Sequence, residues 1–412
     1  MNKKIGNIFK GDKVIWMVFF FLCMISIVEV FSASSNLTYK SQNYMGPIVF
    51  HTVTIILGAV VAVVTLNIPC RYFKLMTPFL LIITVVLLLW VLAAGERTGD
   101  ASRWINIFGL TFQPSEIAKG TIVLATAQIL SAMQRENGAD KKAFKYILCI
   151  VAPIAFLIMV ENLSTAALLC LVVYLMMFIG RVPAFQLIKL AGVVIGLALV
   201  GLLLIMAVGN DNNVAVDKAQ TEQVASAPKE KSKIEKLLHR ADTWKSRIKK
   251  FSNKEVITPD QYDLDKDAQV AHANIAIVSS NIIGKGPGQS VERDFLSQAF
   301  SDFIFAIVIE ELGIVGATGV VFLYIVLLYR TARIASRCEN NFPAFLAMGL
   351  ALLLVIQASF NMLVAVGIAP VTGQPLPLIS KGGTSTIINC AYIGVILSVS
   401  RSAKKRELKI AE

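Results

Sequence analysis

Hydrophobic stretches recur along the whole chain and are separated by short polar segments. Each stretch of about 17–25 residues is long enough to cross a bilayer as a helix. The apolar residues run continuously and do not alternate with polar ones, so a transmembrane β-barrel is excluded. We therefore predict an all-α polytopic membrane protein with about ten transmembrane helices. The predicted spans are 14–32, 47–67, 75–94, 115–133, 145–161, 163–180, 186–208, 302–329, 343–369 and 385–400.

Lysine and arginine are distributed unevenly between the loops on the two sides of these spans. One side collects twenty of them, whereas the short loops of the other side hold only Lys40, Arg97, Arg103 and Lys381. Because basic residues favour the cytoplasmic side, this split predicts that both termini are cytoplasmic. The net charge of +12 is then mainly a topology signal. Binding to nucleic acid is the weaker interpretation.

Residues 209–300 form one long segment between the seventh and eighth predicted spans, and we expect them to be a large extracytoplasmic loop. Four apolar residues recur at helical spacing over 234–248, which predicts an amphipathic helix, either at the membrane surface or packed on the protein. Residues 268–283 are too short and polar for a span and fit a re-entrant or interfacial helix, ended by the glycine-rich run 284–288. The chain as a whole is predicted to be a single integral membrane domain.

Asp302 lies where this polar segment enters the eighth span. An ionisable carboxylate at the mouth of a membrane helix is costly, which makes it a candidate for chemistry. The pair Ser301-Asp302 at a helix start is equally typical of an N-terminal cap. Glu310 lies eight residues further on, about 12 Å along a helix, and faces broadly the same sector, while Glu311 points elsewhere. Asp302 and Glu310 would therefore suit a pocket that leads from the mouth to the interior.

A second group of polar residues surrounds the start of the fourth span. After Gln113, the run Pro114-Ser115-Glu116 is typical of a helix beginning, and Glu116 in its first turn complements the helix dipole. Glu116 and Lys119 are three residues apart and can form an ion pair on one helix face. Lys119 lies deeper and needs a partner, for which the two acids of the eighth span are candidates.

The loop before this helix carries Arg103 and Trp104. Tryptophan is common at the membrane interface for reasons unrelated to function. The functional alternative is that the Arg103 guanidinium binds a phosphate, for which its two parallel donors are well suited.

The third group is the segment 370–385 before the last span. Three prolines and three glycines at membrane depth predict non-helical backbone, which is tolerated only where protein or a water-filled cavity satisfies it. Lys381 lies beside Gly382 and Gly383 at a helix N-terminus, where it could meet an anion. A tight turn between two helices is the simpler alternative.

Taken together and in this order, the three groups resemble the SEDS family of bacterial cell-wall polymerases, which includes FtsW and RodA. The match spans nearly the whole chain, and the ordered set is specific although each motif alone is weak. The first span and residues 176–183 favour an FtsW-like member. The motifs are Arg103-Trp104, Gln113-Pro114-Ser115-Glu116 with Lys119, Ser301-Asp302-Phe303-Ile304-Phe305 followed by Glu310-Glu311-Leu312-Gly313, Asn361, and Pro377 through Ser385.

The resemblance implies a glycosyltransferase of the bacterial cytoplasmic (inner) membrane that polymerises lipid II into peptidoglycan strands. It also implies partnership with a monofunctional penicillin-binding transpeptidase and with other membrane proteins of division or elongation. Asp302 matches the family's essential aspartate. The candidate substrate-binding residues are Arg103, Trp104, Lys119, Arg293, Ser380, Lys381, Gly382 and Gly383. The candidate supporting residues are Gln113, Ser115, Glu116, Glu310, Glu311 and Asn361.

Residue chemistry agrees with such a reaction, in which a sugar hydroxyl attacks an anomeric carbon that carries polyprenyl diphosphate. Asp302 can remove the proton of the acceptor C4 hydroxyl as a general base. Arg103, Lys119, Arg293 and Lys381 are candidate cations for the departing diphosphate. A divalent cation such as Mg²⁺ or Mn²⁺ could share that task, but the sequence shows no ligand cluster beyond the single carboxylate.

This sequence departs from the family pattern in three places. The usual Gln-Pro-Asp-Leu-Gly-Thr run is replaced by residues 160–165, so that Asn162 stands where the family has an acid. The usual Pro-Glu-Ala-His-Thr before the aspartate is replaced by 297–301, and Lys381 stands where a tyrosine is usual. Asp302 thereby loses the glutamate and histidine that could have been its acid–base partners.

Two other functions fit parts of the pattern. A flippase or transporter of lipid-linked precursors would also use intramembrane charges and broken backbone. It would place its ionisable groups near the midplane, and no inverted repeat is evident. A non-enzymatic scaffold of the division machinery would not depend on Asp302.

Overall fold

The computed structural model describes residues 10–34, 46–94, 96–98, 101–107, 110–208, 264–296 and 299–410. Ten long helices in this part of the chain coincide with the ten predicted spans. They are α2 (Lys13–Ala33), α4 (Gly46–Asn67), α5 (Cys70–Ala94), α6 (Pro114–Ala132), α7 (Lys141–Glu161), α8 (Leu163–Ile179), α9 (Ala184–Val208), α13 (Ile304–Ala335), α14 (Asn341–Ala365) and α15 (Thr384–Ile410).

Eight of the helices within the described ranges are long and apolar enough to cross a membrane. The other two are α6, which carries Glu116 and Lys119, and α8, which has 17 residues. The prediction of a polytopic helical membrane protein is confirmed by this architecture.

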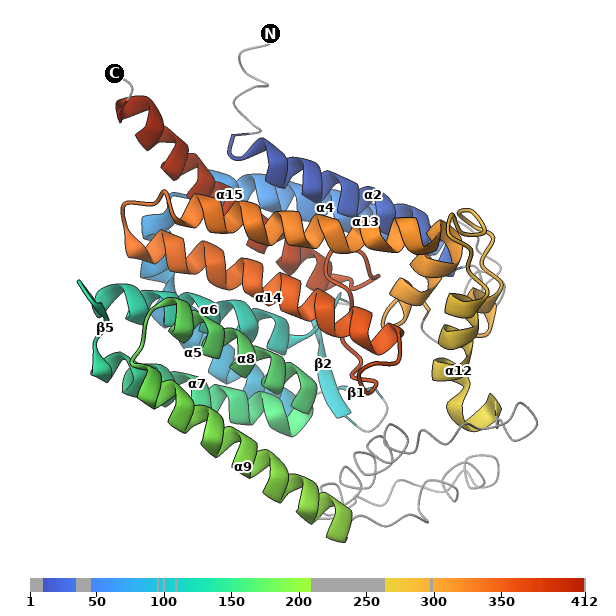
Figure 1. Cartoon of the computed structure of the whole chain (residues 1–412), viewed down its shortest axis with the longest axis horizontal. Coiled ribbons are helices and arrows are strands. Elements are labelled where there is room, and N and C mark those ends of the chain that lie inside the picture. Colours follow the sequence, from blue (N-terminus) through green and yellow to red (C-terminus); the bar gives the residue numbers. More distant parts are fainter. Residues whose placement is uncertain are drawn as a thin grey trace.

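The helices lie side by side in a bundle (Figure 1). α14 packs between α13 and α6, and α15 packs along α4. α9 lies at the edge of the bundle beside α8 and is the least buried of the eight spans. α14 and α15 are the most buried of the eight spans.

The start of the first span and the end of the last lie together at one end of the bundle (Figure 1). The backbone N–H of Asp12 donates to Ser400 Oγ at 2.9 Å, and the Asp12 carboxylate accepts from Arg330 Nε at 2.8 Å. Asp12 also caps α2 by accepting from the backbone of Val14 at 2.9 Å. Because the first span starts and the last span ends at the same end of the bundle, the arrangement agrees with an even number of membrane crossings.

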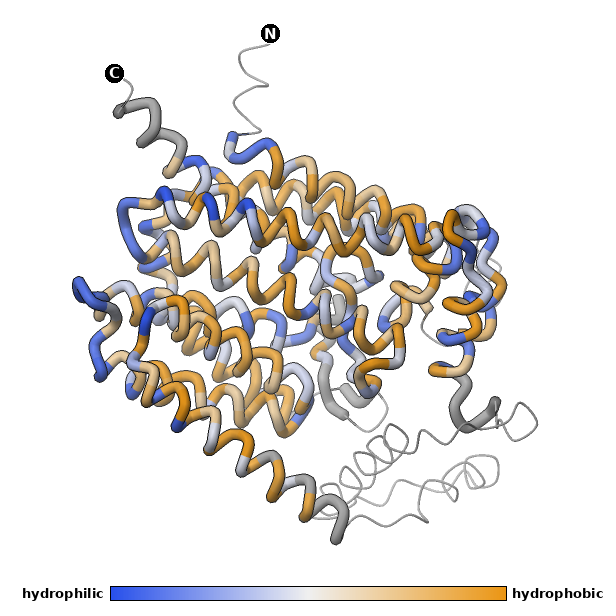
Figure 2. The backbone as a smooth tube through the Cα atoms, in the orientation of Figure 1, coloured by the Kyte–Doolittle hydropathy of each residue, from blue (hydrophilic) through white to orange (hydrophobic). Residues whose placement is uncertain are grey.

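The helices are hydrophobic along most of their length, and hydrophilic residues gather mainly at their ends and in the connecting loops (Figure 2). Phe79 and Phe185 are exposed at 64% and 79%, as expected for side chains that face lipid. α2 carries polar residues in the second half of an otherwise apolar helix. Ser26, Glu29 and Ser32 are all buried there. Buried polar groups therefore line the interior between α2 and its neighbours.

Two small sheets lie between helices of this predominantly helical chain, a detail that the sequence does not predict. Between α5 and α6, strands β1 (Glu96–Thr98), β2 (Ala101–Ile107) and β3 (Leu110–Phe112) form an antiparallel sheet. Between α6 and α7, β4 (Gln134–Arg135) pairs with β5 (Gly138–Ala139). Trp104 and two isoleucines of β2 are typical strand formers, but a segment this short carries too little pattern to separate strand from loop.

α13 is not the single continuous span that the hydrophobic run predicts. Gly313 has φ 68° and ψ −173°, and it divides the helix into two segments with different directions (Figure 1). A side chain at Gly313 would place its Cβ 2.3 Å from the carbonyl oxygen of Ile282. Only glycine fits a left-handed backbone this close to a neighbouring chain.

The loop that meets this break follows α12 (Leu264–Val278) and leads to the short 3₁₀ helix η2 (Glu292–Asp294). Its backbone N–H groups at Lys285 and Gly286 donate to the carbonyls of Glu310 and Glu311, both at 2.9 Å. The predicted helix over 268–283 is therefore present but ends at Val278. The predicted amphipathic helix over 234–248 lies outside the described residues.

Candidate active site

Asp302 lies in a turn one residue before Phe303, which occupies the N-cap position of α13. The side chain of Ser301 donates to Asp302 Oδ1 at 3.0 Å. Asp302 is partly exposed, whereas Phe303 and the first turn of α13 are buried. A partly exposed carboxylate at the edge of a buried segment is accessible to a second molecule.

The backbone around Asp302 is held by hydrogen bonds on three consecutive carbonyl groups. Phe300 O accepts from the backbone N–H of Lys381 at 2.9 Å, and Ser301 O accepts from Ser380 Oγ at 2.6 Å. Asp302 O accepts from Asn361 Nδ2 at 2.8 Å. Since all three donors come from α14 and the loop that follows it, this loop fixes the position of Asp302.

The loop between α14 and α15 is non-helical, as predicted, and side chains hold its backbone from several helices. Leu378 within it has φ 66° although it is not glycine, a strained conformation of a kind that clusters at functional sites. Ser380 Oγ also accepts from the N–H of Leu376 at 2.7 Å, so it bridges the loop to Ser301. The remaining donors are Asn361 Nδ2 to Gln374 O (2.8 Å), Gln357 Nε2 to Pro375 O (3.1 Å), Tyr324 Oη to Pro377 O and Ser26 Oγ to Ile379 O (2.7 Å).

Lys381 brings a cation to the same place. Its ammonium lies 5.1 Å from the ring centroid of Phe300, in a cation–π contact. Burial lowers the pKa of Lys381 from its usual value. Gly382 and Gly383 follow directly and lead into the N-terminus of α15, where Gly383 has φ 52°. A cation and a helix N-terminus therefore lie next to the segment that carries Asp302.

Lys119 is wholly buried inside the bundle. Its ammonium forms the predicted ion pair with Glu116 at 2.8 Å and donates to Gln357 Oε1 on α14 at 2.7 Å. The ion pair within α6 is thus confirmed. The expectation that Glu310 or Glu311 would be the partner of Lys119 is wrong, because both acids bind a different part of the chain.

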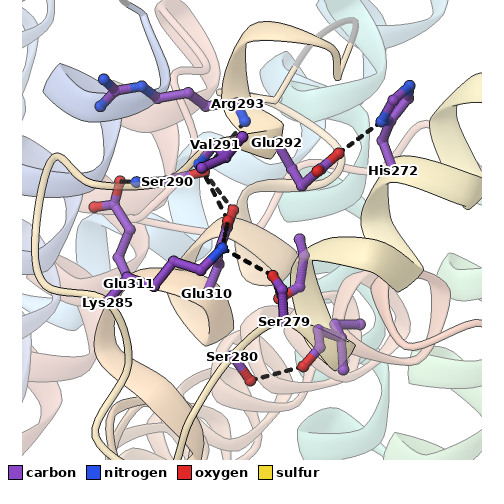
Figure 3. A network of polar contacts seen from close by, with 12 residues as sticks. His272, Ser279, Ser280, Lys285, Ser290, Val291, Glu292, Arg293, Glu310 and Glu311 are labelled. Atoms are coloured by element: carbon purple, nitrogen blue, oxygen red, sulfur yellow. Dashed lines mark hydrogen bonds and ion pairs between the residues drawn. The ribbon is translucent and has the colours of Figure 1, made fainter.

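Glu310 and Glu311 bind the loop between α12 and η2 (Figure 3). Glu310 accepts from Lys285 Nζ at 2.6 Å and from Ser290 Oγ at 2.5 Å. Glu311 accepts from the N–H groups of Gly288 at 2.9 Å and Ser290 at 3.2 Å, and from the hydroxyl of Ser32 on α2. The two acids therefore hold this loop on α13, and the structure does not join Glu310 and Asp302 in one pocket.

Arg293 belongs to the same network. Its Nη1 donates to Ser32 Oγ at 2.8 Å and to the carbonyl of Gly288 at 2.7 Å. The guanidinium is therefore engaged with the protein's own groups. His272 on α12 lies beside this network, where its Nδ1 is 2.6 Å from Glu292 Oε2 (Figure 3).

The remaining predicted residues lie near the starts of β2 and α6. Trp104 is half-buried in β2, opposite Glu96 of β1. The backbone of Arg103 is in the same strand, and its side chain lies outside what the structure describes. Gln113 occupies the N-cap position of α6 without a side-chain capping bond, and with Ser115 it lines a small cavity that also borders α5, α7 and Asn162.

Several residues of the site were not identified from the sequence. Gln357, Gln374 and Tyr324 all hydrogen-bond the α14–α15 loop or its surroundings, and all three are buried. A glutamine or serine inside an apolar span is a usable signal, because polar side chains in membrane helices usually have partners. Gln357 and Ser26 both carry that signal.

A metal site would need several oxygen or nitrogen ligands close together. Throughout the described ranges, no group of three or more His, Cys, Asp or Glu side chains could hold a metal ion.

Comparison with known proteins identifies the family. A family model described as a cell cycle protein (FtsW, RodA and SpoVE) matches residues 12–405. The chain belongs to this family. Its sequence is 30% identical over 397 residues to a probable peptidoglycan glycosyltransferase FtsW of Halomonas elongata, covering 94% of this chain and 90% of the relative.

Another FtsW/RodA-family relative, peptidoglycan glycosyltransferase MrdB of Escherichia coli K12, is 28% identical over 395 residues, covering 95% of this chain and 94% of the relative. Among solved structures, the fold is similar to that of the rod shape determining protein RodA of Thermus thermophilus, with a TM-score of 0.62, 21% identity and coverage of 96% and 98% of the two chains. A structure described as a peptidoglycan synthase complex that coordinates polymerization and crosslinking matches with a TM-score of 0.67, 23% identity and coverage of 95% and 98%. These structures share the fold of this FtsW/RodA-family chain.

Proposed function

We propose that this protein is a peptidoglycan glycosyltransferase that polymerises lipid II, with Asp302 as the general base. The observation that carries the proposal is the fixed backbone of Asp302, held through the carbonyls of residues 300, 301 and 302. A base must lie within hydrogen-bond distance of the proton that it removes, and a fixed backbone maintains that geometry. The names of the two curated relatives support the same reaction class.

The reaction requires one proton transfer and one substitution. The Asp302 carboxylate accepts the proton of the acceptor's C4 hydroxyl, and the resulting oxygen attacks the anomeric carbon of the donor. A C–O bond forms there as the bond to the polyprenyl diphosphate breaks. The hydroxyl of Ser301 orients the carboxylate through its bond to Oδ1.

The departing diphosphate develops negative charge, which a nearby cation and helix N-terminus stabilise. Lys381 supplies the cation, and Gly382 and Gly383 let the backbone approach the diphosphate at the start of α15. The family resemblance supports Arg103 and Trp104, both in strand β2, as further residues that bind the sugar or phosphate.

Three of the predicted substrate-binding residues are better assigned structural roles. The Lys119 ammonium is buried between Glu116 and Gln357. The Arg293 guanidinium and the Ser380 hydroxyl are likewise engaged with the protein's own groups. The Lys119 ammonium and the Ser380 hydroxyl therefore have little capacity left for a substrate. Arg293 is held through Nη1, although its Nε has no hydrogen-bond partner among the described residues.

The proposal includes location and partner. The charge asymmetry of the loops supports the bacterial cytoplasmic membrane with both termini cytoplasmic. The similarity to a solved peptidoglycan synthase complex supports a partner that performs crosslinking, such as a monofunctional penicillin-binding transpeptidase. Asp302 then faces the extracytoplasmic side, where lipid II would be consumed.

The experiment uses the purified protein and its transpeptidase in vesicles that contain labelled lipid II. Wild type is expected to form glycan strands and Asp302→Asn to form none. Asp140→Asn is the matched control, since Asp140 caps α7 at the opposite side and asparagine caps helices equally well. Equal product from wild type and Asp302→Asn would contradict the proposal, and movement of lipid II across the vesicle without polymer would favour a flippase.

A further inference from the structure

A chain of buried hydrogen bonds runs from Asp302 to the start of α8. Asn361 Nδ2 donates to the carbonyl of Asp302 and to the carbonyl of Gln374, both at 2.8 Å. The side chain of Gln374 continues the chain, because its Nε2 donates to Thr165 Oγ1 at 2.8 Å. Three segments far apart in the sequence are joined in this way: α8, the turn that carries Asp302, and α14 with the loop that follows it.

The three side chains that link Asp302 to α8 are buried. Asn361 and Thr165 are each 1% exposed, and Gln374 is 4% exposed. A buried polar group that loses its partner cannot recover the bond from solvent, at a cost of about 1–3 kcal/mol. The bonds are therefore expected to persist, so that a change at Thr165 alters the position of the Asp302 backbone.

The orientation of the Asn361 amide is unambiguous. Its NH₂ group faces two carbonyl oxygens, and the opposite rotamer would place Oδ1 against both of them. In the observed orientation Asn361 Oδ1 is buried with no hydrogen-bond partner among the described residues. The Asn361 amide therefore holds the carbonyls of Asp302 and Gln374 with its NH₂ group, while its oxygen makes no hydrogen bond to the described residues.

The far end of the chain is fixed by the start of α8. α7 ends at Glu161 and α8 begins at Leu163, so Asn162 alone joins them, with φ −152° and ψ 96°. Asn162 Oδ1 accepts from the N–H of Thr165 at 3.2 Å and so caps α8. An amide oxygen serves as a cap as well as a carboxylate, so the asparagine at this position retains the capping function. Because the cap fixes the backbone of Thr165, it also directs the hydroxyl toward Gln374.

We propose that Thr165 and Gln374 are positioning residues for Asp302, an inference that rests on the proposed role of Asp302 as the base. The bond between their side chains fixes the backbone of Gln374, which together with Asp302 O fixes the Asn361 amide. Neither residue touches the reacting atoms. Their effect is on the geometry of the carboxylate, where a displacement of about 1 Å can reduce a rate about 100-fold.

The test compares turnover rather than stability alone. Thr165→Val removes the hydroxyl at nearly constant volume, and Thr165→Ser restores it. We expect Thr165→Val to lower kcat for lipid II polymerisation about tenfold. KM for lipid II is expected to stay near wild type, because the bond does not contact substrate. The thermal unfolding temperature is expected to fall, because the buried Gln374 Nε2 loses its partner. Thr165→Ser is expected to recover most of the loss.

A matched control and a second variant complete the test. Thr318→Val also removes a hydroxyl from a helical threonine, but Thr318 is exposed and bonds only the carbonyl of Ile314, at 2.7 Å, among the described residues. It should retain wild-type kcat. Gln374→Met probes the same bond from the other side, and the double variant with Thr165→Val should be no slower than the slower single variant.

The outcomes separate this inference from the proposed function. If Asp302→Asn is inactive while Thr165→Val turns over at the wild-type rate, the positioning role is wrong and the proposed function stands. Equal losses for Thr165→Ser and Thr165→Val, or losses that multiply in the double variant with Gln374→Met, would also overturn it. If Asp302→Asn polymerises lipid II normally, the assignment of Asp302 as the base fails, and the positioning role fails with it.

Discussion

The hydroxyl of Ser380 donates to the carbonyl of Ser301 at 2.6 Å, across 79 positions of sequence. The same oxygen accepts from the N–H of Leu376 at 2.7 Å. One small side chain therefore joins the loop between α14 and α15 to the turn that carries Asp302. The substitution that removes it should affect both stability and turnover.

Ser380→Ala leaves two buried backbone groups without their partner. We expect a loss of about 1–3 kcal/mol in the free energy of unfolding. Polymerisation is expected to decrease as well, because Ser301 is released. Thermal unfolding and the rate of glycan formation measure the two effects. A Ser380→Ala protein with wild-type stability and rate would show that the bridge has no role.

The buried ion pair of Glu116 and Lys119 predicts a non-additive response. Lys119→Met leaves the Glu116 carboxylate buried and uncompensated, which typically costs about 3–5 kcal/mol. The double variant Glu116→Gln/Lys119→Met removes both charges and should recover much of that stability. Thermal unfolding of the single and double variants checks this. A double variant less stable than Lys119→Met would contradict the ion-pair account.

Lys381 predicts an alkaline limb in the pH dependence of activity. Because burial lowers its pKa below the ordinary 10.5, the ammonium loses its proton at a lower pH than an exposed lysine would. If the positive charge stabilises the leaving diphosphate, activity should decrease as pH rises through that pKa. Lys381→Arg should move the decrease to higher pH, because the guanidinium stays protonated.

The control for this profile is Lys381→Met, which should lower the rate at all pH values and lose the Lys381-dependent alkaline limb. Rates of polymerisation from neutral pH to about pH 10 measure all three proteins. An unchanged alkaline limb in Lys381→Met would assign it to another group.

Gly313 tests whether the break in α13 is required. A Cβ there would lie 2.3 Å from Ile282 O, and the backbone has φ 68°. Gly313→Ala should therefore destabilise the protein by more than about 1 kcal/mol. It should also make the 282–291 loop more susceptible to limited proteolysis.

Gly319→Ala is the matched control. A Cβ added at Gly319 would have no neighbour within 4 Å, so the stability of this variant should be equal to or higher than that of wild type. Equal behaviour of the two variants would contradict this account.

The helices were predictable from the sequence, and the reason is physical. The length and continuity of each apolar run are set by the bilayer, so all ten helices lie where the runs predict them. The non-helical loop before α15 was predictable in the same way, from its prolines and glycines. The ion pair of Glu116 and Lys119 followed from a spacing of three residues.

Other features depend on contacts that local sequence does not encode. The break at Gly313 is stable because a loop from before α13 satisfies the freed carbonyls of Glu310 and Glu311. The second partner of Lys119 is Gln357, which is 238 positions away. Local spacing could suggest that Lys119 needs a partner and that Glu310 is too polar for lipid, but it could not say which residues meet them.

The most direct test of the account is the single-turnover rate of glycosidic-bond formation by Asp302→Asn, compared with wild type at saturating lipid II. Loss of a general base is expected to lower this rate about 10²- to 10⁴-fold, with lipid II binding retained. A rate within a few-fold of wild type would contradict the assignment of Asp302 as the base.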